Sequence, residues 1–215
     1  MKRELSGIMA IVLGIMMIAS NASAYPVSIN DVVKVTDAGP NGGGELTIVN
    51  ITAGNSFATF CLEKTEYVAI YPPETYKVYD ISNYAMGGGG GAVGGKDELD
   101  PRTKWLYYNF ASGSLTTAYG YVKSNMGLYG EGALQLAIWY LENELSSVGD
   151  GSYFLGLANL YGTSGANLSV QVMNIYGPLP GTCPAQSFLV ATPEPLTIVL
   201  MGMGLIGLAG LRRKK

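Results

Sequence analysis

The hydrophobic period of the chain changes twice, and this change limits the folds that the chain can adopt. Residues 25–84 contain short segments in which apolar and polar side chains alternate, such as VVKVTDA and GELTIVNITA. This alternation predicts β-strands. Residues 99–162 carry apolar residues at helical spacing, and residues 167–190 return to a strand-like pattern. The sequence therefore predicts an α+β fold, a mainly β domain over residues 25–190 with an inserted helical region.

A glycine tract, MGGGGGAVGG, separates the first strands from the helical region. Such a composition is typical of a flexible linker and marks a natural boundary. Directly after it, Asp100 is predicted to be an N-cap, with Pro101 at the first helical position. The strongest helical pattern follows later, from Gly132 to Leu145.

The N-terminus predicts export. Two basic residues in MKREL precede the apolar stretch SGIMAIVLGIMMIA, and Ala22 and Ala24 form an A-x-A cleavage pattern before Tyr25. This order is typical of a secretory signal peptide, which we assign to residues 1–24. An uncleaved N-terminal anchor is the alternative, and the small-residue site argues for removal.

The C-terminus, residues 191–215, predicts a sorting and anchor segment. Pro193, Glu194 and Pro195 precede 16 uncharged residues and the basic ending RRKK. As a helix, the uncharged stretch measures roughly 24 Å, while a bilayer core is about 30 Å thick. We therefore predict a single transmembrane helix that spans with local thinning or snorkelling, with the basic cluster on the cytoplasmic side.

This C-terminal order of parts resembles the PEP-CTERM sorting signal of exported bacterial proteins. The resemblance implies recognition by an exosortase-type membrane protease and removal of the tail. It also implies display at the cell surface or in the extracellular matrix, in bacteria that produce exopolysaccharide.

Composition excludes several classes of function. The chain has no histidine and only two cysteines, which excludes histidine-based catalysis and both histidine-ligated and thiolate zinc sites. Without Glu4 and the six basic residues of the two ends, 7 of the 13 basic and 15 of the 16 acidic residues remain, a net charge near −8. Such a charge argues against nucleic-acid binding. No cofactor or metal is predicted.

Cys61 and Gln135 are the residues with the most open interpretation. Gln135 lies at the border of the apolar stripe of its helix, where an amide either reaches water or points into a pocket. Cys61 is either a small buried hydrophobe, half of a disulfide with Cys183, or a reactive thiol.

The segments FCLE and LQLAIW resemble the motifs of bacterial surface thioester domains, with Leu134 where the best-known version has threonine. The resemblance implies a γ-glutamyl thioester between Cys61 and Gln135, shielded from water by Phe60 and Trp139. It implies covalent attachment to an amine on a surface protein, in adhesion or biofilm cross-linking. A single-use bond of this kind is not a turnover enzyme.

The alternative function is a non-covalent structural or exopolysaccharide-binding surface protein, for which the 15 tyrosines offer stacking surfaces. An exported hydrolase ranks last, because no acidic pair stands out. Glu63, Glu66, Glu142 and Glu144 are predicted to lie on solvated faces, with their roles left open.

Overall fold

The computed structural model describes residues 25–37, 44–70, 74–87, 89–123, 127–177 and 184–191. The predicted signal peptide, Cys183, and the predicted sorting motif with its transmembrane helix lie outside these residues. Within the described ranges, no helix combines the length and the apolar character needed to cross a bilayer. Residues Tyr25–Ala191 form one compact unit.

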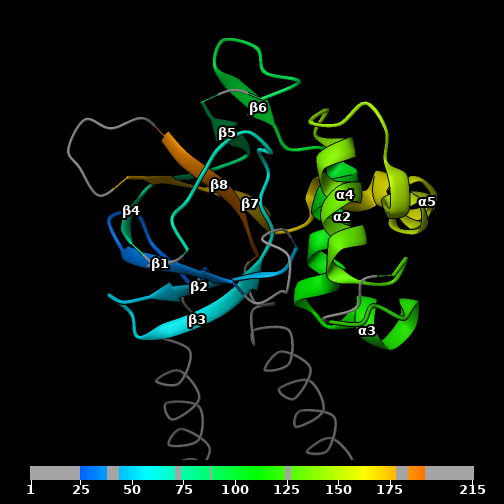
Figure 1. Ribbon diagram of the computed structural model, residues 1–215, viewed down its shortest axis with the longest axis horizontal. Helices are drawn as coiled ribbons and strands as arrows, with labels where there is room; N and C mark the ends of the chain where they lie inside the picture. Colours follow the sequence, from blue (N-terminus) through cyan, green and yellow to red (C-terminus); the bar gives the residue numbers. More distant parts are fainter. Residues whose placement is uncertain are drawn as a thin grey trace, which may run out of the picture. The chain divides into compact units, whose positions relative to one another are not determined.

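A six-stranded antiparallel sheet forms the β part of this unit (Figure 1). Its strands follow the order β3-β2-β1-β4-β7-β8. Their bounds are β1 Val32–Asp37, β2 Leu46–Asn50, β3 Asn55–Thr59, β4 Thr75–Ser82, β7 Val170–Tyr176 and β8 Pro184–Ala191. Burial alternates along β2, as the sequence pattern predicts for a half-buried strand. The α+β class with a mainly β core is confirmed.

The sheet curves so that its two edges meet. Leu62 N–H donates to the Ser187 carbonyl at 3.0 Å, and Leu189 N–H donates to the Phe60 carbonyl at 3.2 Å. The strand-like pattern of the sequence continues through SFATFCLEKTEYVAI, but β3 ends at Thr59 because its partner β2 begins opposite that residue. Residues 60–62 then leave β2 and run beside β8 at the far end of the strand order.

The helices of the described chain lie between β6 and β7 in the sequence, and Figure 1 shows them grouped on one side of the sheet. They are α2 Pro101–Ala111, α3 Ser114–Tyr119, α4 Glu131–Leu141 and α5 Ser152–Tyr161, with 3-10 turns η2 Gly149–Gly151 and η3 Gly162–Asn167. The predicted start of α2 is confirmed, since the Asp100 side chain accepts from Arg102 N–H at 2.7 Å.

α4 ends before Leu145, the last residue of the predicted helix. Asn143 adopts a left-handed conformation, with φ at 61°. The N–H groups of Asn143 and Glu144 donate back to the carbonyls of Tyr140 and Trp139, at 3.3 and 2.8 Å. This arrangement is a Schellman motif, which closes the helix and turns the chain away.

Two apolar cores lie on opposite faces of β7 and β8, whose residues alternate between them. Val172 and Leu189, which are paired across the two strands, face the helices. The next pair, Met173 and Phe188, faces the interior of the curved sheet. Because both faces are covered, these two strands are among the most completely buried parts of the molecule.

The glycine tract takes part in a small hairpin. β5 (Tyr84–Met86) pairs with β6 (Lys96–Glu98), and residues 89–95 form the connection between them. Gly94 and Gly95 have positive φ, which glycine adopts at no steric cost. The described part of the tract is therefore an ordered turn and not the flexible linker that its composition predicts.

Candidate functional site

Gln135 is buried in the middle of α4, with 1 % of its surface exposed. Leu134 and Ile138 pack in the core between α4 and the sheet. From another side, η2 comes so close that a Cβ on Gly151 would lie 2.6 Å from the backbone nitrogen of Ala137. Because α4 is covered from both directions, the border of its apolar stripe, where Gln135 lies, does not reach solvent. The interpretation of Gln135 as a water-exposed amide is wrong.

The Gln135 amide is hydrogen-bonded to both backbone groups of Cys61. Cys61 N–H donates to Gln135 Oε1 at 3.1 Å, and Gln135 Nε2 donates to the Cys61 carbonyl at 2.8 Å. The neighbours Phe60 and Leu62 use their backbone groups towards β8. The backbone groups of successive residues in an extended segment point to opposite sides. The glutamine side chain therefore occupies the place that another strand would take beside Cys61.

Cys61 is half-buried as a residue, and its thiol forms no disulfide within the described chain. Burial raises the pKa of this thiol to about 12; a hydrogen bond with the Gln186 side chain lowers the pKa, and the charge of Glu66 raises it. The thiol is therefore protonated at neutral pH, and its reaction requires a group that accepts the proton. Since Cys183 is outside the described residues, its pairing with Cys61 stays a prediction.

Gln186 is a second glutamine beside Cys61, which sequence reasoning missed. It is 3 % exposed, and its Nε2 donates to the Glu63 carbonyl at 2.6 Å. Its Oε1 is buried without a hydrogen-bond partner in the described structure. The alternation along β8 places Gln186 on the same face as Phe188. Its proximity to Cys61 depends on the closure of the sheet, which no local pattern encodes.

The two aromatic residues predicted beside the site have different environments. Phe60 is fully buried in the core on the helix side, where its ring meets Phe110 edge to face with centroids 4.9 Å apart. Cys61 packs instead against the core inside the curved sheet. Trp139 is half-buried, and its indole N–H has no hydrogen-bond partner among the described residues. Of these two aromatic residues, Phe60 is therefore the one that holds residues 60–62 against the helices.

The acidic residues near the site are less exposed than expected. Glu63 and Glu142 are 1 % and 4 % exposed, so their prediction as solvated surface charges is wrong. The Glu142 carboxylate accepts from Asp100 N–H, at 3.3 and 3.4 Å, and so connects the end of α4 to the start of α2. Burial is the main cause that raises the pKa of Glu142 to about 8 and that of Glu66 to about 7.

Residues 191–214 match the PEP-CTERM protein-sorting motif. This match confirms the predicted motif at Pro193, Glu194 and Pro195 and identifies an exported protein with a membrane-anchored sorting signal at its C-terminus, consistent with processing by an exosortase. Neither the curated proteins nor the solved structures contain a match to the chain.

Proposed function

We propose that this exported protein carries an internal thioester between Cys61 and Gln135, which fixes the protein covalently to an amine at the cell surface or in the extracellular matrix. The single observation that supports this function is the pair of hydrogen bonds between the Gln135 amide and the Cys61 backbone. These bonds bring the two residues together from the helical region and from the segment after β3.

The hydrogen bond to the amide oxygen of Gln135 favours attack on the amide carbon. Cys61 N–H donates to the Gln135 carbonyl oxygen, where negative charge develops when a nucleophile adds. The amide nitrogen, which must leave, is held by the Cys61 carbonyl. Fixing the nucleophile and the carbonyl on one rigid framework supplies effective concentrations of about 10⁵ M or more.

The chemistry balances without a cofactor. The Cys61 sulfur forms a bond to Cδ of Gln135, the C–N bond of the amide breaks, and the thiol proton leaves with the nitrogen as ammonia. A primary amine then attacks the thioester carbonyl, forms an amide, and returns the proton to the Cys61 sulfur. Each protein reacts once, so the chain is a covalent trap and not a turnover enzyme.

The surroundings suit a bond that must survive until an amine arrives. Gln135 is almost fully buried, and the core that contains Phe60 excludes water from the helix side. The sorting motif brings the protein to the outside of the cell. There, lysine side chains of other proteins are the expected partners in adhesion or biofilm cross-linking.

A non-covalent surface protein is the second candidate. The same hydrogen bonds satisfy the buried amide of Gln135 without any reaction, and the raised pKa of the Cys61 thiol is typical of a structural cysteine. On this alternative the site only fastens α4 to the segment after β3, and binding of exopolysaccharide or of another partner uses other surfaces.

Intact mass of the full chain, purified in mild detergent, distinguishes the two. A thioester predicts the loss of one ammonia, followed by the gain of one whole methylamine when that amine is added. Gln135→Ala and Cys61→Ala should both abolish methylamine uptake. Gln171→Ala, a change at a partly exposed glutamine of β7, is the matched control and should retain it.

Gln186→Ala tests the choice of glutamine. Gln186 also contacts the thiol. Methylamine uptake that survives Gln135→Ala and disappears in Gln186→Ala would show that Gln186, and not Gln135, forms the thioester. If the mass is unmodified and Cys61 can be alkylated in the unfolded chain, no thioester is present, and the non-covalent function is favoured.

A further inference from the structure

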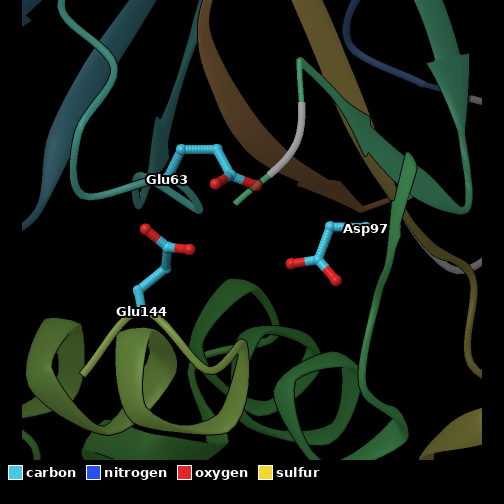
Figure 2. A group of neighbouring side chains, drawn as sticks. All are labelled: Glu63, Asp97 and Glu144. Atoms are coloured by element: carbon cyan, nitrogen blue, oxygen red, sulfur yellow. The ribbon is translucent and has the colours of Figure 1, made fainter. Parts of the chain in front are cut away.

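Three carboxylates from separate parts of the chain point towards one another (Figure 2). Glu63 follows Cys61 by two residues, Asp97 lies in the middle of β6, and Glu144 follows α4. One oxygen from each side chain lies within 4.8 Å of the others. Oxygens at such separations define a space in which a single atom can touch all three.

The local structure fixes two walls of this space. The Schellman motif at the end of α4 turns the chain at Asn143, and Glu144 then accepts from the N–H groups of Gly90 and Lys64, the latter at 3.0 Å. Gly89 covers the carboxylates so closely that a Cβ there would lie 1.9 Å from Glu63 Oε2 and 2.2 Å from Glu144 Oε1. A larger residue at this position would require the Glu63 and Glu144 side chains to shift.

Glu63 lacks the partners that a buried charge requires. It is 1 % exposed, and in the described structure both of its carboxylate oxygens are without accessible surface and without a hydrogen-bond partner. Ionised carboxylates only accept hydrogen bonds, so Asp97 and Glu144 cannot satisfy it. An uncompensated buried carboxylate is costly.

Among the described residues, no basic side chain forms an ion pair with the three carboxylates. The ion pairs found among the described residues are Arg102 with Asp100 and Lys123 with Glu45, and neither involves this cluster. Glu63 and Asp97 are both buried, and the three carboxylate groups lie close together, so their ionised forms would repel one another. The cluster therefore needs either a shared proton or a cation.

We propose that Glu63, Asp97 and Glu144 bind one divalent cation, with Ca²⁺ preferred over Mg²⁺. Both ions take oxygen ligands, but Mg²⁺ is usually bound by one or two carboxylates and keeps several waters, whereas Ca²⁺ accepts more carboxylates in a flexible geometry. Three carboxylates whose oxygens lie within 4.8 Å of one another therefore favour Ca²⁺. Two positive charges offset most of the three negative charges, and an exported protein meets Ca²⁺ at millimolar levels, where extracellular sites bind.

The site lies where three segments meet, which Glu144 already links through the hydrogen bonds that it accepts from Gly90 and Lys64. The cation connects the segment after Cys61, the β5–β6 hairpin and the end of α4, the helix that carries Gln135. Its binding should therefore stabilise the region around the Cys61–Gln135 pair. The cation site does not depend on the thioester, because its ligands take no part in that bond.

Calorimetric titration of the full chain with Ca²⁺, after treatment with EGTA, tests the proposal. We expect one site with a Kd of about 10⁻⁴–10⁻³ M, as in extracellular modules. At ten times this Kd, the Tm followed by intrinsic fluorescence should rise by roughly 3–6 °C. Mg²⁺ at the same concentration should give a smaller rise.

Glu63→Gln and Glu144→Gln should each weaken Ca²⁺ binding at least ten-fold and remove the shift in Tm. Asp150→Asn, on the exposed turn η2, is the matched control and should keep both. Far-UV circular dichroism of each variant verifies that it folds. Measurement in the Cys61→Ser background separates this result from any thioester chemistry.

Several outcomes would overturn the proposal. A Tm that does not respond to Ca²⁺, or a response that persists in both glutamine variants, shows that these residues hold no cation. A Glu63→Gln chain that is more stable than wild type, together with indifference to Ca²⁺, shows that a shared proton fills the role. An equal shift with Mg²⁺ refutes the stated preference for Ca²⁺.

Discussion

Removing the Gln135 amide should destabilise the fold by an amount that the structure sets. The test uses Gln135→Ala in a Cys61→Ser chain, because residue 61 then cannot form a thioester but keeps the backbone groups that contact Gln135. Alanine leaves the N–H and the carbonyl of residue 61 without partners, since their neighbours already bond to β8.

The expected loss follows from the contacts. Two hydrogen bonds contribute about 0.5–1.5 kcal/mol each, and the buried methylene that alanine lacks contributes about 0.8 kcal/mol. The free energy of unfolding should therefore fall by about 2–4 kcal/mol. For a unit of this size, each kcal/mol lowers Tm by about 2–4 °C, so the total shift is about 4–16 °C.

Urea unfolding followed by tryptophan fluorescence measures this change, and a melting curve provides the second reading. Gln171→Ala in the same Cys61→Ser background is the reference, because Gln171 is only half-buried and its loss should cost about 0.5 kcal/mol or less. If Gln135→Ala costs no more than Gln171→Ala, the hydrogen-bonded pair does not fasten α4 to the sheet, and the reasoning fails.

Two further predictions concern the thiol and the end of α4. In the folded Gln135→Ala chain at pH 8, iodoacetamide should alkylate Cys61 roughly 10³-fold more slowly than in the unfolded chain, because the pKa is about 12 against an ordinary 9.0. The alkylation rate of the folded chain should increase with pH. Glu66→Gln should also increase this rate, because it removes a charge that raises the pKa of the Cys61 thiol. Equal rates in the folded and unfolded chains at pH 8 would contradict the raised pKa. Asn143→Ala should lower the free energy of unfolding by about 1 kcal/mol, because alanine disfavours the left-handed conformation. Asn143→Gly should leave that free energy unchanged or increase it slightly. Urea unfolding measures both variants, and an alanine variant more stable than the glycine variant would contradict this prediction.

The local parts of the fold follow from local sequence. Alternation along LTIVN predicts the half-buried strand β2, and an aspartate before a proline predicts the start of α2, because both patterns act over a few residues. The end of α4 was missed because a left-handed Asn143 closes a helix as glycine does, and the leucine after it prolongs the apolar spacing.

The site depends on contacts that no short pattern contains. Gln135 is buried because η2 covers a side of α4 that the sheet does not reach. Gln186 reaches Cys61 because residues 60–62 close the sheet against β8, which lies more than a hundred residues later in the chain. Glu63, Asp97 and Glu144 each resemble ordinary surface charges until the hairpin and the end of α4 bring them together.

The match to the sorting motif begins at Ala191, which is also the last residue of β8. A force applied at Ala191 along the strand direction would therefore act first on β8. Loaded this way, its hydrogen bonds to β7 and to residues 60–62 share the force in shear instead of breaking one after another. In a protein tethered at this end and covalently held at Gln135, the load would pass from β8 to residues 60–62 and from there to α4.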